Sequence, residues 1–147
     1  MIRRWIGLLS LGLLVVAAGV AAQQAAPQAQ AAKPAGNGWQ LPQDAEDTKN
    51  PFPADAKLLD AGKTVFKDKC VRCHGPGGLG DGKDAEPEHQ EDMDLTNPRR
   101  AARNSDGVVF YKVMNGRKQP KMPAFKDELT KDQVWSVVAY VQTLRRQ

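Results

Sequence analysis

The chain has 147 residues, of which 26% are charged, and its formal net charge is +4. This length allows one domain with accessory segments. Acids outnumber bases over residues 44–94, whereas bases outnumber acids over residues 95–147, so the chain is dipolar more than basic. Because the sequence also shows no nucleic-acid-binding motif, we do not expect it to bind nucleic acid.

Residues 1–22 have the order of a secretory signal peptide. A short positive region, Met1 to Arg4, precedes an almost entirely apolar run from Trp5 to Ala22, whose last residues are small. The run is somewhat long for a signal core and somewhat short for a membrane span, which needs roughly 20 residues. We expect cleavage after Ala22, with an uncleaved N-terminal membrane anchor as the alternative. Both outcomes predict export, to the periplasm of a bacterium or an equivalent compartment.

Residues 23–53 are expected to form an Ala/Gln/Pro-rich linker and N-terminal extension. Gln23 to Gly38 lacks the apolar periodicity that would bury one face, so we expect a flexible linker there. Residues 39–53 have prolines at positions 42, 51 and 53, and we expect them to wrap the following domain without regular structure.

Residues 54–147 are predicted to form one domain that opens with a helix from Asp55 to Lys69. Its apolar residues recur at spacings of three and four, which is typical of one buried helix face: Leu58, Leu59, Gly62, Val65 and Phe66. A glycine in mid-helix costs up to about 1 kcal/mol relative to alanine. We therefore expect another segment to pack so closely at Gly62 that no side chain fits.

The predicted helix leads into Cys70-Val71-Arg72-Cys73-His74, which is the attachment signature of a c-type haem. Each thiol adds across one vinyl group of the porphyrin, and the adjacent histidine is then held beneath the iron as its ligand. A zinc site needs two further ligands at metal-binding spacing, but the chain has no third cysteine and His89 is its only other histidine. A thioredoxin-like pair lies where a strand enters a helix, unlike this segment. A simple disulfide and a partial metal site are the alternatives to haem.

A glycine-rich segment from Gly75 to Asp84 follows the motif. Its glycines permit positive φ angles, so we expect its backbone to lie against the porphyrin. We also expect one of its carbonyls to accept the free ring N–H of His74. The acidic stretch from Ala85 to Asp94 is expected to be exposed, and Leu95 is expected to anchor the chain to the core.

Two further helices are predicted, one from about Gly107 to Met114 and one from Lys131 to Arg145. The second opens with the capping-box pattern Thr130-Lys131-Asp132-Gln133. Its two final arginines favour a helix C-terminus electrostatically.

Methionine is the strongest candidate for the second axial position of a haem iron, because a thioether raises the reduction potential and suits electron transfer. Met122 lies between prolines at positions 120 and 123, which restrict the backbone and lower the entropy cost of placing sulfur against iron. Met122 is therefore the predicted ligand. Met93, Met114, His89 and an open position are the alternatives.

The stretch from about Leu58 to Leu144 resembles the small bacterial class I cytochromes c. The matching pieces stand in the order of that family: Gly62 and Phe66, Cys70-Val71-Arg72-Cys73-His74-Gly75, Gly80-Asp81-Gly82, Asp94-Leu95-Thr96, Asn115-Gly116, Met122-Pro123-Ala124-Phe125 and Val138-Ala139-Tyr140-Val141. The chain departs from the family at Lys83, where relatives often have proline.

The resemblance implies an all-α fold in which three to four helices and their loops wrap around one covalently attached haem c. It implies that Cys70 and Cys73 attach the haem, that His74 is the proximal ligand and that Met122 is the distal ligand. It also implies that Gly62 marks the place where the first and last helices cross, with Phe66 and Tyr140 packed nearby.

We expect the protein to be a periplasmic one-electron carrier and not an enzyme, because the cofactor carries the chemistry while both axial positions stay filled. Its partners would be redox proteins, such as a reductase, a dehydrogenase or a terminal oxidase. Basic residues such as Lys118 and Lys121 would steer this docking, although ordinary solvated charges explain them equally well. One alternative is a haem-bearing subunit of a larger periplasmic oxidoreductase complex. Another is a sensor or peroxidase-like protein with an open sixth position.

Overall fold

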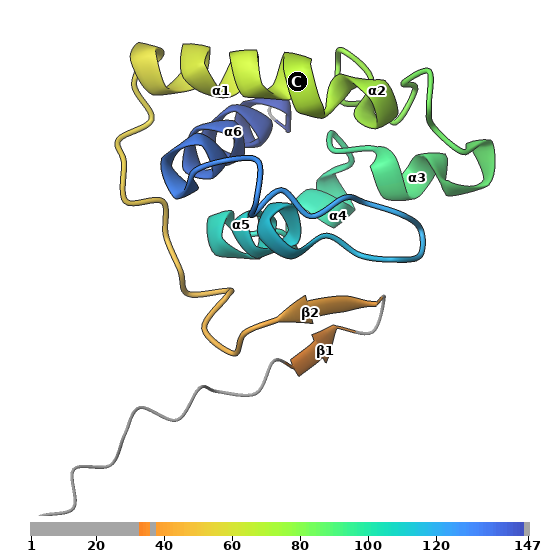
Figure 1. Ribbon diagram of the computed structural model, residues 1–147, viewed down its shortest axis with the longest axis horizontal. Helices are drawn as coiled ribbons and strands as arrows, with labels where there is room; N and C mark the ends of the chain where they lie inside the picture. The colour runs from red at the N-terminus through yellow and green to blue at the C-terminus, as the bar shows by residue number, and fades with distance from the viewer. Residues whose placement is uncertain (1–32, 36–37, 146–147) are drawn as a thin grey trace, which may run out of the picture.

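A computed structural model describes residues 33–35 and 38–145 (Figure 1). The predicted signal peptide or anchor and most of the predicted linker lie outside these residues. The elements in chain order are β1 (Lys33–Ala35), β2 (Trp39–Leu41), α1 (Ala56–Lys69), α2 (Val71–His74), η1 (Pro87–His89), α3 (Gln90–Met93), α4 (Pro98–Ala101), α5 (Asp106–Asn115) and α6 (Lys131–Leu144).

The fold is mostly helical, as predicted, and its long helices α1, α5 and α6 agree with the expected ranges to within a residue or two. A short antiparallel pairing of β1 with β2 sets Lys33 opposite Leu41 and Ala35 opposite Trp39. The expectation of no regular structure after residue 38 was therefore wrong for the strand β2. Of the helices within residues 38–145, none has the length and apolar character to cross a membrane.

Helix α1 crosses α6 at Gly62 (Figure 1). A Cβ atom on Gly62 would collide with the backbone carbonyl of Ser136 and with the Cβ of Tyr140. The ring of Phe66 packs against that of Tyr140, with 5.3 Å between the centroids. The close approach expected at Gly62 is confirmed, and apolar burial between the two helices offsets the low helix propensity of glycine.

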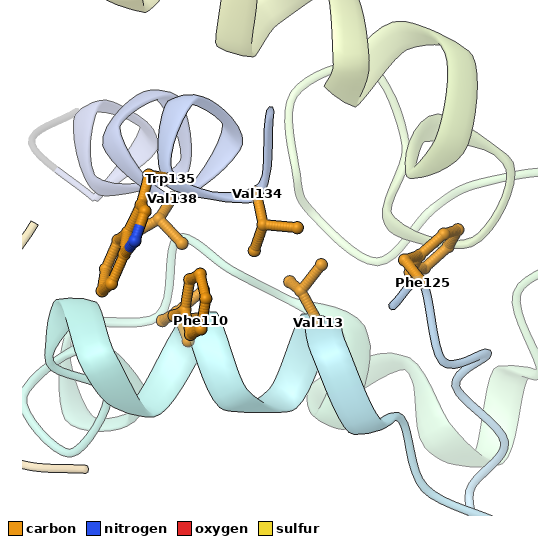
Figure 2. Close-up of a cluster of buried hydrophobic side chains, with 7 residues drawn as sticks. Phe110, Val113, Phe125, Val134, Trp135 and Val138 are labelled. Carbon is orange, nitrogen blue, oxygen red and sulfur yellow. The ribbon is translucent and has the colours of Figure 1, made fainter. Parts of the chain in front are cut away.

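The main core lies between α5 and α6, where Phe110 and Val113 point toward side chains of α6 (Figure 2). The rings of Phe110 and Trp135 stack with centroids 4.1 Å apart. The buried cluster contains Val109, Phe110, Val113, Phe125, Val134, Trp135 and Val138. A second cluster joins α1 to another face of α6 through Phe66, Val137, Val141 and Leu144. Helix α6 is therefore the element on which both other long helices pack.

The N-terminal extension is bonded to α5 and α6. The N–H of Gly107, in the first turn of α5, donates to the carbonyl of Thr48 at 3.0 Å. The side-chain amide of Asn50 donates to the carbonyl of Trp135 at 2.9 Å. The side chain of Ser105 makes no capping bond to α5, so the extension supplies a partner that a cap would otherwise provide.

Candidate haem-binding site

Cys70, Cys73 and His74 come together because α1 runs directly into the one-turn helix α2. The N–H groups of Cys73 and His74 donate to the carbonyl of Cys70, at 3.2 Å and 3.0 Å. Residues at positions i, i+3 and i+4 lie on one face of a helix. All three line a cavity of about 560 Å³, a volume within the range of cofactor sites.

The ring of His74 is oriented by a backbone carbonyl. Its Nδ1 lies 2.6 Å from the carbonyl oxygen of Met93, and because a carbonyl only accepts, Nδ1–H must be the donor. The lone pair is then on Nε2, the tautomer that metal ligation needs. Burial lowers the pKa of His74, which favours the same neutral imidazole.

The partner of His74 differs from the prediction, which expected a carbonyl of residues 75–84. In that segment the carbonyl of Gly75 accepts from the N–H of Gly78. The carbonyl of Gly78 accepts from the N–H of Leu95, which follows α3. A bridge between Leu79 and Asp94 lays the end of α3 beside the loop and brings the Met93 carbonyl to the histidine.

The glycine-rich segment also lies elsewhere than predicted, since its backbone was expected to lie against the porphyrin. Gly75, Gly78 and Gly80 have φ angles of +74°, +75° and +76°, as expected for glycine-dependent turns. A Cβ atom on Gly80 would lie 2.5 Å from the carbonyl of Gln90, so the loop packs against α3. No residue of 75–84 lines the cavity, although Met93, Asp94 and Leu95 do. The loop therefore supports the cavity wall from behind.

Both cysteines are free and their thiols are held in the neutral form. Burial raises the pKa of Cys70 to about 12, with the charges of Cys73 and Asp68 adding to the shift. Burial, followed by the charge of Asp84, also raises the pKa of Cys73. A structural zinc site takes four protein ligands, and a pair of cysteines supplies two of them. No metal-binding group of three or more His, Cys, Asp or Glu occurs in the described part of the chain.

Met122 reaches the same cavity from a separate loop, which we define as the Met122 loop, residues 116–125. The N–H of Arg117 donates to the carbonyl of Met122, and the N–H of Met122 donates to the carbonyl of Arg117, both at 2.9 Å. The N–H of Phe125 donates to the carbonyl of Val113 at 3.0 Å, which ties the loop to α5. The thioether is therefore positioned by backbone bonds on both sides.

The other candidate ligands differ in whether they line the cavity. Met114 packs against the core cluster and His89 lies 3.7 Å from a carboxylate oxygen of Glu86, and neither lines the cavity. Met93 does line it, but its backbone is the hydrogen-bond partner of His74. Met122 comes from a segment independent of His74, which suits a ligand for the opposite face of a haem.

Several cavity residues escaped the sequence analysis. Trp39 is buried and lines the cavity, together with Lys112 and Arg145. The signal for Trp39 was a single large aromatic in an otherwise polar, proline-rich segment. Arg145 lies at the C-cap of α6, as expected, and its Nη1 also donates to the carbonyl of Asn104 at 2.6 Å, which was not expected.

The residues present fit a covalently attached haem c. Two neutral thiols and a neutral, oriented imidazole share one face of a single turn, and a thioether lines the same cavity. When bound, the haem supplies an iron that gains and loses one electron.

Comparisons with known proteins agree with this chemistry. Residues 59–145, more than half of the chain, match the cytochrome c family. Over 85 residues the chain is 33% identical to cytochrome c6 of Parathermosynechococcus lividus, covering 56% of this chain and 86% of that protein. A reducing HAO-like protein complex of Kuenenia stuttgartiensis contains a chain that is 29% identical with a TM-score of 0.51, covering 64% of this chain. This chain spans only 46% of that one. The chain therefore belongs to the cytochrome c family, whose covalently bound haem c serves electron transfer.

Proposed function

We propose that the protein is an exported, mono-haem, one-electron carrier in which His74 and Met122 bind the iron from opposite faces. The sequence has one pair of cysteines, which supports one attachment site. The observation that carries the proposal is that His74 and Met122 line one cavity while belonging to separate elements.

The roles of the chain's residues follow from this arrangement. The Met93 carbonyl holds the imidazole of His74 in one tautomer and raises its basicity as a ligand. The thioether of Met122 raises the reduction potential. His74 and Met122 would together hold the iron and leave no position for a substrate, the property that would separate a carrier from an oxygen- or peroxide-activating enzyme.

The ligand assignment is tested by carbon monoxide binding to the reduced holoprotein. Met122→Ala should open the sixth position and bind carbon monoxide readily, whereas the unaltered protein should bind it poorly. Met93→Leu and Met114→Leu are matched controls that should behave like the unaltered protein. Ready binding by the unaltered protein would instead favour a sensor or peroxidase-like function.

Docking to redox partners such as a reductase, a dehydrogenase or a terminal oxidase is proposed to use the exposed Lys118 and Lys121 of the Met122 loop. Complementary charge raises association rates and is screened by salt. The double variant Lys118→Gln/Lys121→Gln should lose most of the salt dependence of electron transfer to an acidic partner. An unchanged salt dependence would assign these lysines to ordinary surface charge.

A second candidate is a haem-bearing subunit of a larger periplasmic oxidoreductase complex. The likeness to one chain of the HAO-like complex favours it, because that chain is longer than this one and belongs to an assembly. Purification from the native source discriminates the two: a carrier elutes alone, whereas a subunit elutes with a large partner.

Export to the periplasm is proposed from residues 1–22. Mass spectrometry of the purified protein decides between cleavage and anchoring, because cleavage after Ala22 leaves Gln23 as the first residue. A full-length chain in the membrane fraction would support the anchor.

A further inference from the structure

The haem cavity is lined by more basic side chains than acidic ones, and they come from several elements. Arg100, Arg103, Lys112, Arg117 and Arg145 all line it, whereas its carboxylates are Glu46, Asp92 and Asp94. Asp92 serves two of these cations, with oxygens 2.6 Å from Arg100 Nη1 and 3.6 Å from Arg117 Nη2. Within residues 38–145, Lys112 and Arg145 have no ion-pair partner.

The environment of Lys112 is the first observation that favours an anion-binding site in the cavity. Burial lowers its pKa to about 8, and the nearby arginines, with Arg117 first, lower it further in the same direction. Its ammonium donates to the side-chain carbonyl of Asn104, which offers a dipole but no charge. A partly buried cation without a counter-charge is costly, so an acidic ligand at this place would be favoured.

Arg145 gives a second, independent sign. Its Nη1 donates to the carbonyl of Asn104 and to the side-chain oxygen of Gln142, both at 2.6 Å. Its Nε is buried and has no hydrogen-bond partner. Unpaired buried donors are rare in native proteins, and a guanidinium is shaped to bind a carboxylate.

Trp39 holds two of the cations in place. Its ring centroid lies 5.0 Å from Lys112 Nζ and 4.6 Å from Arg117 Cζ, distances at which cation–π attraction acts. Trp39 belongs to β2 in the N-terminal extension, outside the residues 59–145 that match the family. A segment from beyond the matched domain therefore contributes to the cavity.

The place of these cations suits one particular part of a haem. The vinyl groups, which Cys70 and Cys73 would bond, and the two propionate carboxylates lie on opposite edges of the porphyrin. In Figure 1, β2 lies on the opposite side of the molecule from α1 and α2. The strand that carries Trp39 and the segment that carries the cysteines thus line the cavity from opposite sides, and the cations over the Trp39 ring lie on the side where the anionic edge of an attached haem is expected.

We propose that Lys112, Arg117 and Arg145 bind the haem propionates and that Trp39 positions Lys112 and Arg117 for this task. The N-terminal extension is then part of the haem site and helps to set the reduction potential. Positive charge near the porphyrin favours the ferrous form, so each of these cations raises the potential. This inference rests on the proposed function only in that haem occupies this cavity.

Redox titration of the holoprotein at pH 7 tests the proposal. Lys112→Gln and Arg145→Gln should each lower the equilibrium constant for reduction about tenfold, a fall of about 59 mV for one electron. Trp39→Leu should lower it severalfold, because both cations stay but are less well positioned. If Arg145→Gln does not accumulate, Lys112→Gln alone decides.

Two variants control for charge and for the extension. Lys63→Gln removes the same charge from an exposed position, and Phe52→Leu changes an aromatic residue of the extension; neither residue lines the cavity. Both should keep the unaltered potential.

Potentials of Lys112→Gln and Arg145→Gln equal to that of the unaltered protein would overturn the propionate site. An unchanged Trp39→Leu beside a lowered Lys112→Gln would overturn the role of Trp39. Axial ligation is monitored separately by the visible spectrum, so a failure of the proposed function is distinguishable.

Discussion

The two sides of the haem cavity are built in different ways. The attachment side is one continuous segment, in which the end of α1 and the turn of α2 place Cys70, Cys73 and His74 by helix geometry alone. The Met122 side is assembled from parts that are distant in sequence, including α5 and the N-terminal extension. Local sequence therefore brings Cys70, Cys73 and His74 together, whereas long-range packing is needed to orient the His74 ring and to place Met122 and the cations around the cavity.

The largest effect is expected from removing the two cysteines of the attachment side. Cys70→Ala/Cys73→Ala should abolish covalent haem completely, because no other cysteine exists to form a thioether. Haem staining of a denaturing gel measures the result. Arg72→Ala, in the same turn, is the control and should retain the stain. Covalent haem in the double variant would contradict the assignment of these cysteines.

An intermediate effect, on stability, is expected where α1, the helix that leads into the attachment side, crosses α6. Gly62→Val should cost about 3 kcal/mol of unfolding free energy, since its side chain would meet the Ser136 carbonyl where α1 crosses α6. Denaturant unfolding monitors the loss. Gly77→Ala is the control, because the nearest atoms to its added Cβ lie 3.7 Å away in the side chain of Leu79. Equal stability of the two variants would show that the crossing tolerates a side chain.

A smaller effect on stability, together with a specific effect on iron ligation, is expected from a substitution in the Met122 loop. Gly116 has a φ of +62°, and a Cβ there would collide with the carbonyl of Met122. Gly116→Ala should cost about 2 kcal/mol from backbone strain and displace the thioether, which visible spectroscopy detects. Gly38→Ala shares the left-handed conformation, with φ +81°, but its Cβ would lie 3.6 Å from the nearest atom. Gly38→Ala should therefore keep its ligation, and loss of ligation in both variants would contradict a specific role of Gly116.

Features that depend on neighbouring residues were predictable from the sequence. The apolar spacing of α1, α5 and α6 predicted their ranges, and the capping box at Thr130 and Gln133 is present with both of its bonds. The close approach at Gly62 was also predictable, since a glycine in the middle of an amphipathic helix carries a cost that packing must offset.

Tertiary contacts that leave no local pattern in the sequence were not predictable. The Met93 carbonyl reaches His74 only because Leu79 and Asp94 form a bridge between two loops. Trp39 lies in a segment without periodicity, so no repeating pattern marked its burial, and its size among polar residues was the one signal. The pairing of Arg145 with Asn104 joins positions far apart in the chain, and only the packed fold brings them together.

Binding of the iron by both His74 and Met122 is the basis of the proposed electron-transfer function. The visible spectrum of the oxidised holoprotein tests this binding directly, because sulfur bound to ferric haem gives a weak near-red band. We predict that the unaltered protein shows this band and that Met122→Ala lacks it. A band of equal strength in both proteins, or its absence from the unaltered protein, would contradict the assignment of Met122.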